Sequence, residues 1–263
     1  MTGAIVEGID LRSSDADLVA EVEQLLHEHL VLFFPGQALE AGEQHRLALL
    51  FGDIDVAPFG PKHPDVPEMT VLDQQAPKGQ GADAWHSDNT FRTEPPKYTM
   101  LQAVQLPPHG GDTCWANMYE AFDALSEPMQ KFLEGLTAEH DLSKPLAVAI
   151  QKGLSNADLG EMRKQFPPEH HPVVRTHPVT GRKALFVNSN FTTRIDGLSD
   201  AESSSLLHLL LEHVGSPLFQ CRWRWQPGTL ALWDNRCLQH YAVPDYTSRR
   251  VMHRFTIAGD RPK

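Results

Sequence analysis

Apolar residues recur along the chain with two different periods, one typical of helices and one typical of strands. Over residues 13–29 they recur every three to four positions, after Ser and Asp residues that can cap a helix. This range is therefore predicted to be a helix. Helices are also predicted over residues 40–51, with Gly52 as the terminating residue, and over residues 117–135, 155–165 and 199–214.

Strands are predicted where short apolar runs stand between turn residues or alternate with polar residues. FQCRWRWQ, residues 219–226, alternates along its length, so Trp223 and Trp225 share one face and are predicted to lie in the core. The turn PVTG would join residues 171–176 and 183–188 as a hairpin. The other predicted strands cover residues 30–34, 69–73, 98–106, 229–235 and 249–257.

These many short strands with helices around them predict a mainly β chain of the α+β class. A jelly-roll double sheet fits this pattern better than a doubly wound α/β fold does. We expect one domain over residues 1–263, because no internal repeat divides the chain. No glycine-rich phosphate loop of either common type is present, which argues against a nucleotide cofactor.

Charge and apolar content exclude several classes of partner. The formal net charge is −11 and the basic residues form no long cluster, so neither nucleic acid nor a membrane surface is expected to bind. No apolar stretch approaches the about 18 residues that cross a bilayer, and no secretory leader is apparent, which predicts a cytoplasmic protein. Cys114, Cys221 and Cys237 are widely spaced and odd in number, which argues against a disulfide framework and a thiolate zinc site.

The segment WHSDNTF, residues 85–91, contains the first candidate metal ligands. His86 and Asp88 would point to the same side of a strand and could bind one ion. A surface histidine beside a solvated acid would give the same pattern, since the chain has 14 histidines and 34 acidic residues. Spacing alone therefore does not establish a metal site.

The third ligand would have to come from a distant part of the chain. His240, in WDNRCLQHYAVPDY, would complete the two-histidine, one-carboxylate triad of non-haem Fe(II) oxygenases. From spacing alone it has rivals, which are His45, His63, His109, His140, His170, His171, His177 and His253.

RRVMHRFTI, residues 249–257, is predicted to place Arg250 and Arg254 on one face of a strand. Two guanidinium groups among apolar residues are costly to bury unless each meets an anion. One interpretation is two pockets for ligand carboxylates or sulfonates, which the planar fork of arginine fits well. The other is a pair of arginines whose stems lie on the sheet and whose partners are carboxylates of the chain itself.

Seven segments in order resemble the TauD/TfdA family of taurine/2-oxoglutarate dioxygenases. They are WHSDNTF, GGDTCWAN, HPVVRTHPVTGRKALFVN, FTTRI, RWRWQPG, WDNRCLQHYAVPDY and RRVMHRFTIAGDRP. The resemblance runs from about Gly3 to the C-terminus, with a divergent patch near residues 142–168. It implies a double-stranded β-helix (jelly-roll) core around Fe(II), with 2-oxoglutarate as co-substrate. It also implies hydroxylation of a small organic anion by O2, with release of succinate and CO2, and a homo-oligomer.

The resemblance also implies a role for individual residues. His86, Asp88 and His240 match the family's three iron ligands. Thr113 in GGDT matches the threonine that contacts 2-oxoglutarate, and Arg250 matches the arginine that binds its distal carboxylate. Arg254 then matches the arginine that binds the anionic head of the primary substrate.

The chain departs from the family pattern where the taurine enzyme binds its substrate. Ala57, Gly60 and Ala82 replace a histidine, a tyrosine and an asparagine, and Pro145-Leu146 replaces a serine-phenylalanine pair. We therefore expect a roomier and more apolar pocket, lined in part by Phe191. The predicted substrate is a sulfonate, a sulfate ester or a carboxylate, and not taurine itself.

Two other functions stay open at this point. A non-catalytic jelly roll could bind a metal and sense a small anion, and the intact triad with both arginines argues against it. The second is a zinc hydrolase, which is disfavoured because the sequence has no recognisable zinc motif.

Overall fold

The computed structural model describes residues 2–13, 15–58, 60–75, 83–153 and 155–263. Its largest element is a six-stranded sheet with the order β1-β2-β12-β4-β14-β3, in which every neighbouring pair except β1 and β2 is antiparallel. The strands are β1 (Ala4–Ile5), β2 (Val31–Phe34), β3 (Thr70–Gln74), β4 (Tyr98–Gln105), β12 (Leu230–Asp234) and β14 (Arg250–Ile257).

A three-stranded antiparallel sheet with the order β11-β5-β13 packs against one face of the large sheet. Its strands are β5 (Thr113–Asn117), β11 (Gln220–Trp223) and β13 (Leu238–Ala242). Trp115 of β5 contacts Phe33 of β2 and Trp233 of β12 edge-on, with ring centroids 5.3 and 5.6 Å apart. These aromatic contacts fill the space between the two sheets.

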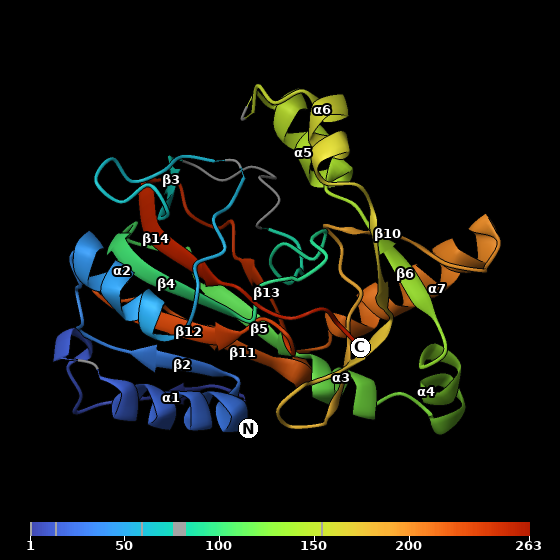
Figure 1. Cartoon of the computed structure of the whole chain (residues 1–263), viewed down its shortest axis with the longest axis horizontal. Helices are drawn as coiled ribbons and strands as arrows, with labels where there is room; N and C mark the ends of the chain where they lie inside the picture. Colours follow the sequence, from blue (N-terminus) through green and yellow to red (C-terminus); the bar gives the residue numbers. More distant parts are fainter. Residues whose placement is uncertain (1, 14, 59, 76–82, 154) are drawn as a thin grey trace.

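Helices α1 (Ala16–His29) and α2 (Ala41–Leu50) cover the opposite face of the large sheet, as Figure 1 shows. Their apolar faces meet alternate strand residues such as Leu32, Met100 and Leu232. Asp15 caps α1 through a hydrogen bond from the Leu18 N–H, and Gly52 follows α2 with a positive φ, as the sequence predicted.

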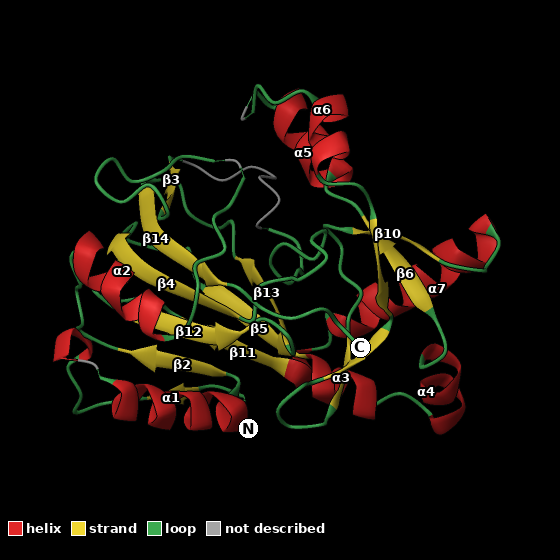
Figure 2. Cartoon of the chain, in the orientation of Figure 1, coloured by secondary structure: helices red, strands yellow, loops and turns green. Residues whose placement is uncertain are grey.

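The remaining elements form a smaller layer beside the sandwich (Figure 2). A second three-stranded sheet has the order β10-β6-β7, and β8 and β9 form the predicted hairpin. The strands are β6 (Thr137–His140), β7 (Glu169–Pro172), β8 (Val174–Thr176), β9 (Lys183–Leu185) and β10 (Thr192–Ile195). The helices are α3 (Met118–Asp123), α4 (Glu127–Leu133) and α7 (Asp200–Val214). A short 3-10 turn at Pro217–Phe219 leads from α7 to β11, and another at Leu11–Ser13 packs beside α2 on the far side of the large sheet.

Helices α5 (Ser143–Gln151) and α6 (Leu159–Gln165) stand as a separate pair above the sandwich in Figure 1. They share a small apolar cluster with Phe91 and Phe191, whose ring centroids are 5.3 Å apart. This pair therefore has its own packing and is attached to the body of the protein near the segment that carries His86 and Asp88.

The α+β class predicted from the sequence is confirmed, and most predicted elements are present within a few residues. The predicted helix 117–135 is wrong as one element, since Pro128 in the first turn of α4 starts a new helix there. Strands β5, β6, β10 and β13 and helix α5 were not predicted. No helix in the described ranges is both long and apolar enough to cross a membrane.

Candidate active site

A cavity of about 290 Å³ lies between the two facing sheets. Strands β3, β4, β12 and β14 contribute to it from one sheet, and β5 and β13 contribute from the other. Helix α5 closes one side with Pro145, Leu146 and Ala149. The cavity contains all three predicted metal ligands together with Thr113, Arg250 and Arg254.

The three predicted metal ligands converge inside this cavity. His86 and His240 form an isolated antiparallel bridge, in which each backbone N–H donates to the other residue's carbonyl at 3.1 and 2.8 Å. Nε2 of His86 lies 3.9 Å from Oδ1 of Asp88, and Nε2 of His240 lies 4.0 Å from its Oδ2. Candidate ligand atoms of all three lie within 4.8 Å of one another, so one ion could bind all of them.

The local structure of the HxD segment differs from the sequence prediction. Only His86 pairs as a strand residue, while Asp88 begins a turn with Asn89 and Thr90. Asn89 has a φ of 50°, a left-handed conformation that asparagine tolerates better than most residues. A tight turn, and not the alternation of a strand, therefore brings the carboxylate beside the two imidazoles.

The surroundings of the triad keep it in a metal-binding ionisation state. Burial lowers the pKa of His86, and burial together with the charge of His86 lowers the pKa of His240 to about 3. Burial would raise the pKa of Asp88, but the charge of Arg254 and the two nearby imidazoles lower it to about 2. Nδ1 of His86 donates to the Ala84 carbonyl at 2.8 Å, which leaves Nε2 as the free ligand atom.

Both oxygens of the Asp88 carboxylate are held by side chains. The Thr99 hydroxyl donates to Oδ2 at 2.8 Å, and Nη1 of Arg254 donates to Oδ1 at 3.1 Å. The second interpretation of the arginine pair, a carboxylate of the chain itself, is therefore correct for Arg254. Its remaining donors can still reach a ligand, because Arg254 lines the cavity.

Arg250 differs from Arg254 because it forms no ion pair with any carboxylate in the described ranges. It is 3% exposed, and its Nε and Nη2 have no hydrogen-bond partner in the described part of the chain. The rings of Trp225 and Tyr246 flank the guanidinium, each with its centroid 6.0 Å away. A buried guanidinium with free donors is energetically costly unless a ligand anion accepts its hydrogen bonds and balances its charge. A carboxylate of 2-oxoglutarate could do both.

The GGDT motif shapes the space around Arg250. A Cβ on Gly111 would lie 3.2 Å from Cδ of Arg250, and Gly111 also has a φ of +75°, so glycine fits this position. The hydroxyl of Thr113 accepts a hydrogen bond from Nε1 of Trp225 at 2.9 Å. Its own proton stays available to an acceptor in the cavity. The prediction of Trp225 as a core residue was incomplete, since this buried ring also positions Thr113 and flanks Arg250.

The other predicted pocket residues have mixed outcomes. Gly60 and Phe191 line the cavity. Ala57 is buried but is not among the lining residues, so the structure does not place it against a ligand. Ala82 lies outside the described residues.

Asn235 is the residue near the site that sequence reasoning missed. Its Oδ1 accepts a hydrogen bond from the Asp88 N–H at 2.7 Å, and its Nδ2 donates to the Asp88 carbonyl at 3.0 Å. The same Nδ2 donates to the Pro96 carbonyl at 3.0 Å. The sequence did contain a signal for this role. Asn235 in WDN directly follows an apolar strand, and a buried amide there must find hydrogen-bond partners.

Polar side chains also hold Asn89 and Thr90, the two residues that follow Asp88 in the turn. Thr90 is fully buried, and its hydroxyl contacts Nδ1 of His140 and Nδ2 of Asn188, both at 2.9 Å. Asn89 donates to Asp55 at 3.1 Å. The turn therefore has little freedom to move, which fixes the position of the carboxylate.

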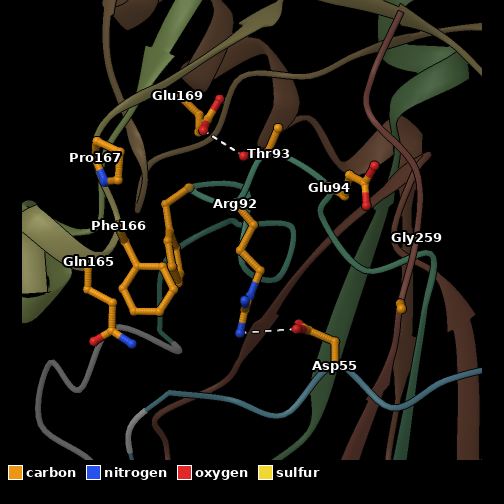
Figure 3. A pocket seen from close by; sticks show the side chains of 11 residues that line it. Asp55, Arg92, Thr93, Glu94, Gln165, Phe166, Pro167, Glu169 and Gly259 are labelled. Carbon is orange, nitrogen blue, oxygen red and sulfur yellow. Dashed lines mark hydrogen bonds and ion pairs between the residues drawn. The ribbon is translucent and has the colours of Figure 1, made fainter.

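A second cavity of about 390 Å³ lies behind this turn (Figure 3). Arg92 forms an ion pair with Asp55 at 3.0 Å across it. Phe91 packs between Phe166 on this side and Phe191 on the side of the first cavity, with ring centroids 5.5 and 5.3 Å apart. This second cavity contains no member of the triad.

His27, His177 and Asp234 form another group with metal-ligand atoms in reach of one another. Nδ1 of His177 accepts the N–H groups of Val179 and Thr180, so its Nε2 carries the proton and donates to Asp234 at 3.0 Å. Arg236 binds both carboxylate oxygens of Asp234. Arg236 already neutralises the Asp234 carboxylate, and Nε2 of His177 is a hydrogen-bond donor and not a free ligand atom. We therefore interpret this group as a structural ion pair and not as a metal site.

Two histidines and one carboxylate around an open cavity define the class of non-haem metal oxygenases with a facial triad. Comparison with known proteins agrees with this class. The family model described as "Taurine catabolism dioxygenase TauD, TfdA family" matches residues 2–256. The chain belongs to the TauD/TfdA family.

Named relatives cover almost the whole chain. An alpha-ketoglutarate-dependent sulfate ester dioxygenase of Pseudomonas putida is 38% identical over 99% of this chain and 87% of that protein. An alpha-ketoglutarate-dependent 2,4-dichlorophenoxyacetate dioxygenase of Cupriavidus pinatubonensis is 37% identical over 97% of this chain and 94% of that protein. The solved structure of AAD-2 in complex with Mn(II) and N-oxalylglycine has a TM-score of 0.83 at 32% identity, covering 99% of this chain and 95% of that one.

These findings confirm the predicted family and the predicted class of enzyme, a 2-oxoglutarate-dependent dioxygenase. The predicted cofactors, Fe(II) with 2-oxoglutarate, agree with the relatives' names and with the converging triad. The non-catalytic sensor and the zinc hydrolase lose their support.

Asn235→Ala should weaken metal binding, because it leaves the N–H and carbonyl of Asp88 without their partner. Loss of a group that orients a metal ligand typically lowers affinity about 10- to 100-fold. Calorimetric titration of the metal-free protein with Mn(II) measures this effect, with the exposed Asn156→Ala as a matched control. A folded Asn235→Ala protein with unchanged Mn(II) affinity would contradict the role.

Asp234→Asn should destabilise the fold by about 3–5 kcal/mol at neutral pH, because Arg236 would keep a buried charge without its partner. Burial raises the pKa of Asp234, but Arg236 and His177 lower it well below its ordinary value. The carboxylate's contribution is therefore complete above about pH 4 and is lost as the pH falls further.

Urea unfolding of wild type and variant between about pH 6 and pH 3 checks this expectation. The difference in free energy of unfolding should shrink towards the acidic end. Asp123→Asn, an exposed carboxylate beside Arg182, serves as the control and should change little. A difference that stays constant or grows as the pH falls would show that the assignment is wrong.

Proposed function

We propose that the chain is an Fe(II)- and 2-oxoglutarate-dependent dioxygenase that hydroxylates a small organic anion. His86, Asp88 and His240 hold the iron, and Arg250 with Thr113 holds 2-oxoglutarate. The observation that carries the proposal is the buried guanidinium of Arg250, which lies in the same cavity as the triad and whose Nε and Nη2 have no hydrogen-bond partner among the described residues. A metal site without a keto acid would leave that charge uncompensated.

Bound iron supplies the oxygen chemistry, in which 2-oxoglutarate is converted to succinate and CO2 as the substrate is hydroxylated. The side chains of the protein supply ligands, orientation and exclusion of water. Arg250 and Thr113 would hold the distal carboxylate of the keto acid, in the same cavity as the three proposed metal ligands. Arg254 stands beside Asp88, where it can place the anionic head of the primary substrate next to the metal.

The walls of the cavity indicate an apolar body on that anion. Leu72, Leu146 and Phe191 line it, and Gly60 offers no side-chain donor. We infer a sulfonate, sulfate ester or carboxylate with an alkyl or aryl group, and not taurine, because Ala57 and Gly60 stand where the taurine enzyme has a histidine and a tyrosine. Relatives named for a sulfate ester and for 2,4-dichlorophenoxyacetate support this class of substrate.

The facing sheets around the cavity support a double-stranded β-helix core, and we propose one domain over residues 1–263. A cytoplasmic location and a homo-oligomer stay predictions.

Anaerobic addition of Fe(II) and 2-oxoglutarate should give a visible charge-transfer band. Oxygen should then be consumed and succinate released when a substrate from a panel of alkyl sulfates, sulfonates and aryloxy acids is present. Asp88→Ala should abolish substrate-dependent succinate formation, while Asp73→Ala, an exposed carboxylate paired with Arg249, should retain it. Turnover by Asp88→Ala with a normal iron content would disprove the triad.

Arg250→Lys should raise the KM for 2-oxoglutarate at least about tenfold, since a bidentate charge-assisted pair is worth roughly 1.5–3 kcal/mol. Arg249→Lys is the matched control. Arg249 precedes Arg250 in the chain, but its guanidinium is exposed and binds Asp73. Steady-state kinetics at saturating primary substrate measures both. An Arg250→Lys protein with an unchanged KM for 2-oxoglutarate would refute this role.

A further inference from the structure

A row of residues across the large sheet extends the cationic part of the cavity beyond Arg254. Arg254 of β14 is paired with Leu101 of β4 on one side and with Thr70 of β3 on the other. Thr70 is in turn paired with Lys62 through an isolated antiparallel bridge. Residues paired in this way point to the same face of a sheet, so Lys62 faces the same way as Arg254.

The face in question is the cavity face. Leu101, Thr70 and Arg254 all line the cavity. Lys62 is not itself a lining residue, but it stands at the outer end of their row, next to Thr70. Nζ of Lys62 lies 3.4 Å from the hydroxyl oxygen of Thr70, which confirms the direction of its side chain. The next residue, His63, points the other way and meets His253, with ring centroids 5.3 Å apart.

Lys62 has donors to spare. It forms no ion pair with a described residue, and the long bond to Thr70 uses one of its three donors. Partial burial and the charge of Arg254 both lower the pKa of Lys62, and the charge of Asp55 raises it. Arg254, by contrast, already gives Nη1 to Asp88.

We propose that Lys62 is a second cation of the primary-substrate site and that it selects head groups with three terminal oxygens. Lys62 and Arg254 are separated by two inter-strand spacings across the sheet, which places their backbones about 10 Å apart. Both side chains are long enough to converge on one anion. A sulfate ester or sulfonate can give two oxygens to the guanidinium of Arg254 and a third to Lys62, whereas a carboxylate that binds this guanidinium through both oxygens has none left for Lys62. The proposal rests on the proposed function, because it concerns the substrate of the same site.

The test compares Lys62→Met and Lys62→Arg with wild type, using hexyl sulfate, hexanesulfonate and hexanoate as substrates. Lys62→Met should raise the KM for hexyl sulfate and hexanesulfonate about three- to tenfold, because the lysine is only partly buried. The KM for hexanoate should rise less, and the KM for 2-oxoglutarate should not change. Lys62→Arg should restore most of the affinity, and Lys131→Met, an exposed lysine paired with Glu127 on α4, is the control.

Some probes could bind without reacting. Calorimetry therefore measures the binding of the same probes, and of neutral hexan-1-ol, to the anaerobic complex of the protein with iron and 2-oxoglutarate. The proposal is overturned if Lys62→Met binds all probes as wild type does. It is also overturned if wild type binds no anionic probe more tightly than hexan-1-ol, or if the loss is the same for hexanoate as for hexyl sulfate. Failure of the proposed function looks different, because the charge-transfer band itself would then be missing from wild type.

Discussion

The paired backbone hydrogen bonds between His86 and His240 are the contact on which the site depends. They join two segments that lie far apart in the sequence, and they do so at the ligand residues themselves. β13 carries His240 and pairs with β5, which carries Thr113, so the same strands also place part of the proposed 2-oxoglutarate site. Packing between the sheets, through Trp115 and Trp233, then sets the distance from these residues to the arginines of β14.

Compensation of buried charge is the second constraint. Asp88 is balanced by Arg254 and Thr99, and Asp234 is balanced by Arg236 and His177, so both carboxylates stay ionised in the interior. Arg250 is the exception, since its Nε and Nη2 find no partner in the described ranges. A protein interior tolerates such a group where a ligand supplies the missing anion.

Local sequence patterns predicted every strand of the large sheet except β1, as well as helices α1, α2 and α7, because alternation and capping residues act over a few positions. They missed β5 and β13, whose residues are almost all buried and so show no alternation. The triad and Arg250 came from family motifs, since spacing alone left eight rival histidines open. The roles of Asn235 and Lys62 depend on long-range pairing that a single sequence does not display, of Asn235 with Asp88 and of Thr70 with Arg254.

The pairing of α5 with α6 has a consequence for how such an enzyme can diversify. These helices touch the substrate cavity but pack mainly on each other and on Phe91 and Phe191, apart from the two facing sheets. Changes in this small module can remodel the substrate wall without loosening the metal ligands. The part of the cavity wall that these helices form is thus structurally separable from the proposed metal ligands, and it can vary under selection while the ligands are retained.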